Sequence, residues 1–149
     1  MEMMTGHLLC FGCGFSARHL ITRLLAEGWT VSATTRLENM PDVDGVEFIA
    51  FDSLLESHIA KASHVLLSAP PDESGDPVLC LYQYLFSRAS HLKWIGYLST
   101  TGVYGDTDGA WVTETSPLKP SSRRSSYRVA AEASWLNLHR KVDLPVHIF

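Results

Sequence analysis

Several features that would place a chain of 149 residues in a special class are missing from this sequence. No apolar run approaches the ~20 residues that cross a bilayer, and residues 1–5 have neither the basic region nor the apolar core of a signal peptide. The net charge is −4, so no basic excess indicates nucleic acid or an anionic membrane as a partner. With 46% hydrophobic residues, we expect one globular domain over residues 1–149, located in the cytoplasm.

Cysteine is also scarce. Three cysteines, an odd number, do not indicate a disulfide framework. Cys10 and Cys13 form a Cys-x-x-Cys pair, which is typical of redox and metal sites. The sequence has no second such pair and no histidine pair at metal-ligand spacing. We therefore expect Cys10 to be a core residue of a strand, Cys13 to fill a free position in a turn, and no metal site.

The most informative stretch is residues 8–17, where a short apolar run meets a glycine-rich turn and an amphipathic helix follows. Gly12 allows a tight turn, Gly14 lets the backbone approach a pyrophosphate, and Ala17 lets the helix pack closely on the strand. The N–H groups at the helix start then face the phosphates. The alternative is a glycine turn with no ligand. The predicted cofactor-binding residues here are Gly12, Cys13, Gly14, Phe15, Ser16 and Ala17.

Strand-like and helix-like segments alternate along the chain. This alternation predicts an α/β fold, a doubly wound parallel (Rossmann) sheet in the order 3-2-1-4-5-6 with helices on both faces. Asp76 and Pro77 are typical of a helix start. The last predicted helix has an apolar side made of Val129, Ala130, Ala133, Leu136 and Asn137. The strands are predicted at 7–11, 29–34, 46–51, 64–68, 94–98 and 146–149, and the helices at 15–27, 54–62, 78–90 and 124–140.

Ligands of such sheets bind at the carboxyl ends of the strands. The second strand lacks the terminal carboxylate that would bind the ribose 2′-hydroxyl of NAD, and Thr35 and Arg36 stand there instead. Arg36 can pair with a 2′-phosphate, which favours NADP over NAD, unless it is a solvated surface arginine. Asp52 could accept a hydrogen bond from the adenine amino group, or cap the next helix, or do both. After the fourth strand, the predicted cofactor contacts are Ser68, Ala69 and Pro70.

Taken together, these motifs resemble a known family. The glycine turn, Thr34-Thr35-Arg36, Asp52, Ser68 to Pro71 and the run Ser99-Thr100-Thr101-Gly102-Val103-Tyr104-Gly105 resemble the extended short-chain dehydrogenase/reductases. This is the NAD(P)-dependent epimerase/dehydratase group, and the resemblance is strongest to its atypical NADP-binding branch. It implies hydride transfer between a nicotinamide and a carbon that bears a hydroxyl or carbonyl group, on a substrate not yet identified. Sugar nucleotides are common substrates of the family. By the same resemblance, Thr100 would hydrogen-bond the reacting oxygen; the alternative is a threonine that caps the loop.

The family's catalytic Tyr-x-x-x-Lys is not intact. Anchoring on Glu132, which corresponds to a common family glutamate, places Arg128 at the lysine position and Arg124 at the tyrosine position. Arg128 could still hold the nicotinamide ribose, whereas the guanidinium of Arg124 stays protonated and cannot shuttle a proton. Tyr127 is the remaining candidate acid/base, although one residue along a helix turns a side chain by about 100°. The alternative for Tyr127 is a packing or surface role.

Length is the second departure from the family, whose substrate domain is built largely after the sixth strand. We expect the chain, which ends at Phe149, to carry the cofactor half and little of the substrate half. Two functions follow: an NADP-dependent oxidoreductase or epimerase, or a non-catalytic NADP-binding module that acts as a sensor or partner subunit. A methyltransferase-like fold is disfavoured by Arg36. A homodimer would pair through the helices that begin near Val78 and Arg124.

Overall fold

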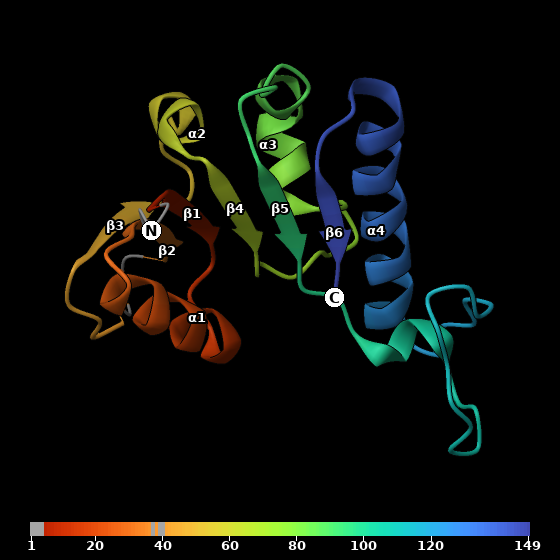
Figure 1. The fold of residues 1–149 in the computed structure, drawn as a ribbon. Helices are drawn as coiled ribbons and strands as arrows, with labels where there is room; N and C mark the ends of the chain where they lie inside the picture. The colour runs from red at the N-terminus through yellow and green to blue at the C-terminus, as the bar shows by residue number, and fades with distance from the viewer. Residues whose placement is uncertain (1–4, 37, 39–40) are drawn as a thin grey trace.

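The computed structural model describes residues 5–36, 38 and 41–149. Its centre is a six-stranded parallel sheet in the order β3-β2-β1-β4-β5-β6, as predicted (Figure 1). The strands are β1 (His7–Phe11), β2 (Thr30–Thr35), β3 (Val46–Ala50), β4 (His64–Leu67), β5 (Trp94–Tyr97) and β6 (Val146–Ile148). The helices are α1 (Phe15–Ala26), α2 (Glu56–Lys61), α3 (Pro77–Phe86) and α4 (Arg123–Val142), with a 3₁₀ turn η2 (Thr101–Tyr104) after β5.

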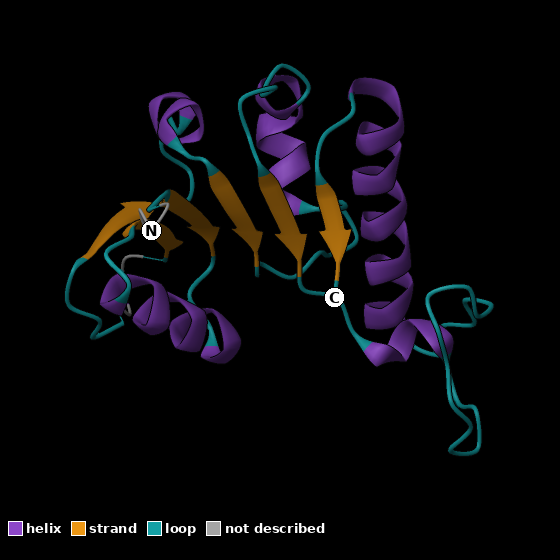
Figure 2. Ribbon diagram, viewed as in Figure 1, coloured by secondary structure: helices purple, strands orange, loops and turns teal. Residues whose placement is uncertain are grey.

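Helices lie on both faces of the sheet, which confirms the doubly wound α/β prediction (Figure 2). Helix α1 packs on one face through Ala17 and Ile21. Helices α2, α3 and α4 pack on the other face and form the larger core. All five residues of β1 are buried, because this central strand is covered on both sides.

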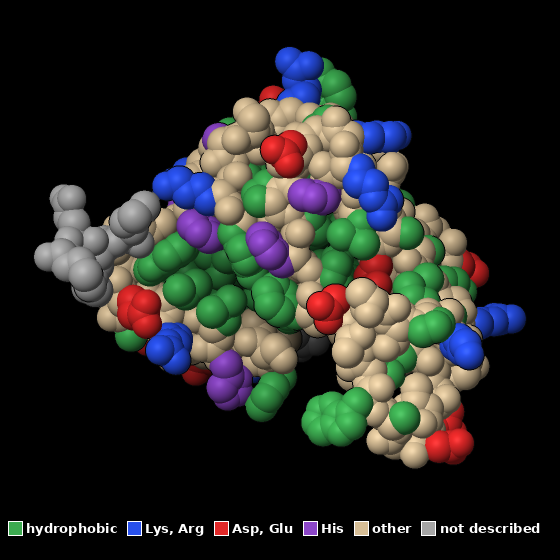
Figure 3. Space-filling model, turned by 45° about the vertical axis from the view of Figure 1, so that its right-hand side comes forward, with side chains coloured by type: hydrophobic (Ala, Val, Ile, Leu, Met, Phe, Trp, Pro, Cys, Tyr) green, Lys and Arg blue, Asp and Glu red, His purple; other side chains and the backbone are tan. Residues whose placement is uncertain are grey.

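On the α1 side, aromatic side chains extend toward the edge at β6. The indole of Trp94 lies against Gly96, where a Cβ would be 2.0 Å from the ring. Trp94 also stacks on His147, with ring centroids 6.3 Å apart, and its centroid lies 6.0 Å from that of Phe149. Among the described helices, only α1 contributes to the core on this side. Figure 3 shows hydrophobic and histidine side chains gathered together on one face of the molecule.

Helix α4 buries a different side from the one predicted. The prediction of an apolar side from Val129 to Asn137 is wrong, because the buried residues are Ala131, Glu132, Trp135 and Leu138. This side carries the indole of Trp135, which is completely buried and packs edge-on against Phe86. Burying an indole removes far more apolar area from water than burying the alanines of the other side. Glu132 is tolerated there because the hydroxyl of Ser99 donates a hydrogen bond to its carboxylate.

Helix α3 begins as the sequence predicts and ends earlier, at Phe86. The carboxyl of Asp76 accepts hydrogen bonds from the backbone N–H groups of Val78 (3.0 Å) and Leu79 (2.9 Å), and Pro77 occupies the first helical position. One side of α3 faces the core, whereas Leu81 and Tyr84 on another side are 57% and 69% exposed. No helix within the described residues is long and apolar enough to span a membrane.

Candidate functional site

The glycine turn after β1 has the geometry that the sequence predicts. Gly12 has φ +91°, and a Cβ at this position would lie 3.2 Å from the backbone nitrogen of Ala69 and 3.3 Å from the carbonyl carbon of Ser68. The positive φ favours glycine, and the close backbone of Ala69 leaves little room for a Cβ. The N–H of Gly12 donates to the hydroxyl of Thr34 at 3.0 Å, which ties the turn to the end of β2.

Gly14 has a different role from Gly12. It is the N-cap of α1 in an extended conformation, and a Cβ here would meet only the hydroxyl of Ser68, at 4.0 Å. No side chain caps α1 at this end. The first N–H groups of the helix therefore face open space, which is the arrangement that binds phosphate at a helix start.

The ends of four strands meet at a cavity of about 490 Å³ beside this turn. It lies at the carboxyl edge of the sheet, the same edge at which α1 begins (Figure 1). Of the predicted cofactor residues it brings together Gly12, Cys13, Gly14, Thr35, Arg36, Ser68, Ala69 and Pro70. The rest of the lining, which is not predicted from the sequence, is made of Arg18, Thr34, Pro41, Phe51, Asp72 and Pro77.

The other predicted cofactor residues lie outside the cavity lining. Ala17 is fully buried beneath the turn, as its predicted packing role requires. Phe15 and Ser16 are exposed in the first turn of α1. Asp52 is exposed, and its neighbour Phe51 lines the cavity instead. Asp52 as the N-cap of the next helix is wrong, because α2 begins at Glu56 with Leu55 at its N-cap.

The predicted catalytic residues lie near the carboxyl end of β5 and do not line this cavity. The hydroxyl of Thr100 accepts from the N–H of Gly102 at 3.2 Å and caps η2. The Nη1 of Arg128 donates to the carbonyl of Leu98 at 2.5 Å and lies 3.4 Å from the hydroxyl of Tyr97. Tyr127 is half-buried in the first half of α4.

Two buried ionisable side chains, the carboxyl of Asp76 and the phenol of Tyr97, lie near Arg128. Burial raises the pKa of Asp76, although the N–H groups of Leu79 and Val78, the indole of Trp135 and the guanidinium of Arg128 favour its charged form. Burial also raises the pKa of Tyr97 to about 12, and Arg128 beside it only partly offsets this. Tyr97 is completely buried, so its hydroxyl is not exposed to a substrate.

The raised pKa of Asp76 predicts a specific dependence of stability on pH. The folded state binds this proton more tightly than the unfolded state, whose value is near 3.8. The resulting stabilisation is present below pH 3.8 and is lost as pH rises through the raised pKa. Asp76→Asn keeps an acceptor for the α3 N-terminus and removes the charge. We expect the free energy of unfolding of the wild type, relative to this variant, to fall as pH rises from 3 to 7.

Urea unfolding at several pH values measures this difference, and Asp106→Asn, at an exposed position, is the matched control. A wild type that gains stability over Asp76→Asn between pH 3 and 7 would contradict the assigned direction of the shift.

The cysteines occupy the positions predicted for them. Cys10 is buried in β1, and its thiol donates to the carbonyl of Gly12 at 2.8 Å. Cys13 lies in the turn and lines the cavity. Burial raises the pKa of both thiols, so both are protonated at neutral pH and are poor nucleophiles.

No protein-family model and no curated protein matches this chain. Among solved structures, a conserved protein of unknown function from Silicibacter pomeroyi is 41% identical, with a TM-score of 0.82 over 97% of this chain and 51% of that chain. The dTDP-glucose 4,6-dehydratase from Bacillus anthracis, solved with NAD, is 22% identical, with a TM-score of 0.77 over 97% and 54%. The UDP-glucuronic acid 4-epimerase from Bacillus cereus, also solved with NAD, is 21% identical, with a TM-score of 0.75 over 95% and 55%.

The chain shares its fold with these solved structures. The chain spans about half the length of each of these solved chains. The likeness covers nearly all of residues 1–149 and therefore includes the glycine turn, the strand ends and α4.

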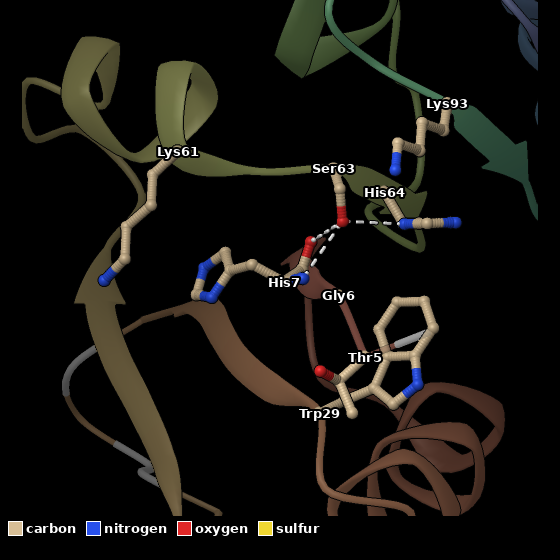
Figure 4. A pocket seen from close by; sticks show the side chains of 8 residues that line it. All are labelled: Thr5, Gly6, His7, Trp29, Lys61, Ser63, His64 and Lys93. Atoms are coloured by element: carbon tan, nitrogen blue, oxygen red, sulfur yellow. Dashed lines mark hydrogen bonds between the residues drawn. The ribbon is translucent and has the colours of Figure 1, made fainter. Parts of the chain in front are cut away.

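A second hollow, of about 520 Å³, lies at the opposite edge of the sheet, where β1 and β4 begin (Figure 4). Ser63 is at its centre: its hydroxyl accepts from the N–H of His7 at 3.0 Å and lies 2.8 Å from the Nδ1 of His64. The ring of His7 is held by the hydroxyls of Thr30 (2.7 Å) and Ser32 (2.9 Å). These polar groups satisfy one another, and the hollow contains no glycine turn or uncapped helix start.

Proposed function

We propose that residues 1–149 form the dinucleotide-binding domain of an NAD(P)-dependent oxidoreductase of the epimerase/dehydratase type. One observation carries this proposal: the glycine turn and the ends of β2 and β4 line one cavity at the carboxyl edge of the sheet. The solved structures that share the fold and contain NAD support it.

The residues around the cavity fit a dinucleotide. The pyrophosphate would lie over Gly14, where no Cβ intervenes and the first N–H groups of α1 lack a side-chain cap. The adenosine ribose would lie toward Thr35 and Arg36, with Phe51 and Asp52 on the adenine side. Because Arg36 stands where NAD would require a carboxylate, we propose NADP as the preferred cofactor. When bound, the nicotinamide supplies the hydride chemistry.

The residues near the end of β5 would position the substrate. Thr100 would hydrogen-bond the reacting oxygen, Arg128 would hold the nicotinamide ribose, and Tyr127 would be the acid/base. Arg128 has donors beyond those directed at Leu98 and Tyr97, because a guanidinium carries five N–H groups. The substrate class we propose is a small molecule oxidised or reduced at a hydroxyl or carbonyl carbon, such as a sugar nucleotide.

The second candidate is a non-catalytic module that binds NADP as a sensor or partner subunit. It is supported by the arginines at positions 124 and 128, and by the burial of the nearby phenol of Tyr97. In either case we propose that a homodimer pairs through α3 and α4, where Leu81 and Tyr84 of α3 are exposed.

Thermal unfolding with equal concentrations of NADP, NAD and S-adenosylmethionine tests the proposed cofactor. A ligand at 100 times its Kd stabilises the folded state by about 2.7 kcal/mol, so we expect the largest rise in Tm with NADP and none with S-adenosylmethionine. Arg36→Ala should reduce the advantage of NADP over NAD. If neither dinucleotide raises the Tm, the central proposal is wrong. If Arg36→Ala keeps the full preference, the role given to Arg36 is wrong.

A further inference from the structure

We infer that Arg18 is a second guanidinium for the 2′-phosphate of NADP, and that Arg18 and Arg36 together determine cofactor choice. This inference rests on the proposed function and deepens it. Arg18 lies in the first turn of α1, outside the glycine motif itself.

The side chain of Arg18 points toward the glycine turn. Side chains on a helix lean toward its N-terminus, so Arg18 turns back toward the glycine turn. Its Nε donates to the carbonyl of Cys13, the residue between the two glycines, at 3.2 Å. This contact leaves the two terminal nitrogens of the guanidinium to bind an anion.

Arg18 and Arg36 belong to different elements and line the same cavity. The two elements are held together by the bond from the N–H of Gly12 to the hydroxyl of Thr34. The turn that holds Arg18 is therefore fixed against the strand end that carries Arg36. Arg18 follows the glycine turn, and Arg36 follows β2, the strand end at which the adenosine ribose would bind.

The charges around this pair favour an anion. The first turn of α1 contains no acidic residue, and neither does the end of β2. Within the described residues, the ion pairs are Arg23–Glu27 and His58–Glu47, so neither Arg18 nor Arg36 has a carboxylate partner. The acidic residue of the lining is Asp72, on the loop after β4, and its carboxylate accepts from the N–H of Ser74 at 2.8 Å.

A 2′-phosphate matches this arrangement, and a 2′-hydroxyl does not. Two guanidiniums in one cavity repel each other, and a dianion between them relieves this repulsion while accepting charge-assisted hydrogen bonds. A role for Arg18 in merely holding the turn, or in binding the pyrophosphate, would help NAD and NADP equally. The ratio of the two affinities therefore separates these roles.

The experiment measures Kd by isothermal titration calorimetry for NADP, NAD, adenosine 2′,5′-bisphosphate and 5′-AMP. The proteins are the wild type, Arg18→Gln, Arg36→Gln, the double variant and the control Arg23→Gln. Arg23 is on the same helix, is exposed and pairs with Glu27 instead. The two adenosine phosphates test the 2′-phosphate contact without requiring the nicotinamide half of the site.

We expect Arg18→Gln to weaken binding of NADP and the bisphosphate about tenfold or more, the range of a lost hydrogen bond to a charged group. Binding of NAD and 5′-AMP should change by less than about twofold, and Arg23→Gln should change none of the four. Equal weakening of NADP and NAD in Arg18→Gln would overturn the inference and leave the proposed function standing. Failure of the wild type to bind any of the four ligands would instead remove the proposed function.

Discussion

Gly14→Val is expected to abolish dinucleotide binding and to leave the free energy of unfolding of the ligand-free protein within about 1 kcal/mol of wild type. The backbone at Gly14 is extended, which valine adopts readily, and a Cβ there meets nothing closer than the hydroxyl of Ser68 at 4.0 Å. The added side chain would stand where the pyrophosphate approaches α1. Urea unfolding followed by titration with NADP gives both quantities.

Gly12→Ala is the matched comparison. A Cβ at Gly12 lies 3.2 Å from the backbone of Ala69, and φ is +91°. Because the opposing atoms belong to the backbone, we expect this variant to lose about 1–3 kcal/mol of folding free energy from strain. The two glycines thus separate a structural requirement from a binding requirement. A Gly14→Val protein that still gains stability from NADP would show that the pyrophosphate does not lie over this turn.

Trp135→Ala is expected to have the largest effect on stability, a loss of about 3–5 kcal/mol. The side chain is completely buried between α4 and α3, and its ring lies 5.1 Å, centroid to centroid, from that of Phe86. The cavity left behind would also border the buried carboxyl of Asp76. Since domains of this kind are stable by about 5–15 kcal/mol in total, the variant should unfold at a much lower urea concentration.

The control for this prediction is Trp111→Ala. Trp111 is fully exposed on the loop before α4, so its loss should change the free energy of unfolding by less than about 0.5 kcal/mol. A small effect of Trp135→Ala, comparable to that of Trp111→Ala, would mean that α4 is not packed on the sheet as described.

The order of the strands could be predicted because it follows from local signals. Each strand is a short apolar run, the connections alternate with helical patterns, and right-handed crossovers leave few orders. Asp76 and Pro77 likewise predict the start of α3 from adjacent residues alone. The buried side of α4 could not be predicted in this way. Two sets of positions fit a helical repeat, and the choice between them depends on Phe86 and β5, far away in the chain.

In the site, too, some residues could be predicted from local sequence and others could not. The glycine turn, Arg36 and Ser68 follow from their places at strand ends, and all of them line the cavity. Arg18 could not be predicted, because its contact with the turn depends on the direction of a helical side chain. A predicted strand over 46–51 gives Asp52 as the residue that follows it, whereas β3 ends at Ala50 and Phe51 lines the cavity. A strand boundary that shifts by one residue changes which side chain points into the site.

The central position of β1 has a consequence for how the domain folds. β1 pairs with β2 through Leu8 and Val31, but its other edge is filled only when His64 of β4 arrives opposite Leu8. Such long-range parallel pairing is slow because a long loop must close before its contacts form. We therefore expect the second wall of the cavity, after β4, to be completed late in folding. A dinucleotide would then retain the finished domain by slowing its unfolding, without accelerating the earlier steps of folding.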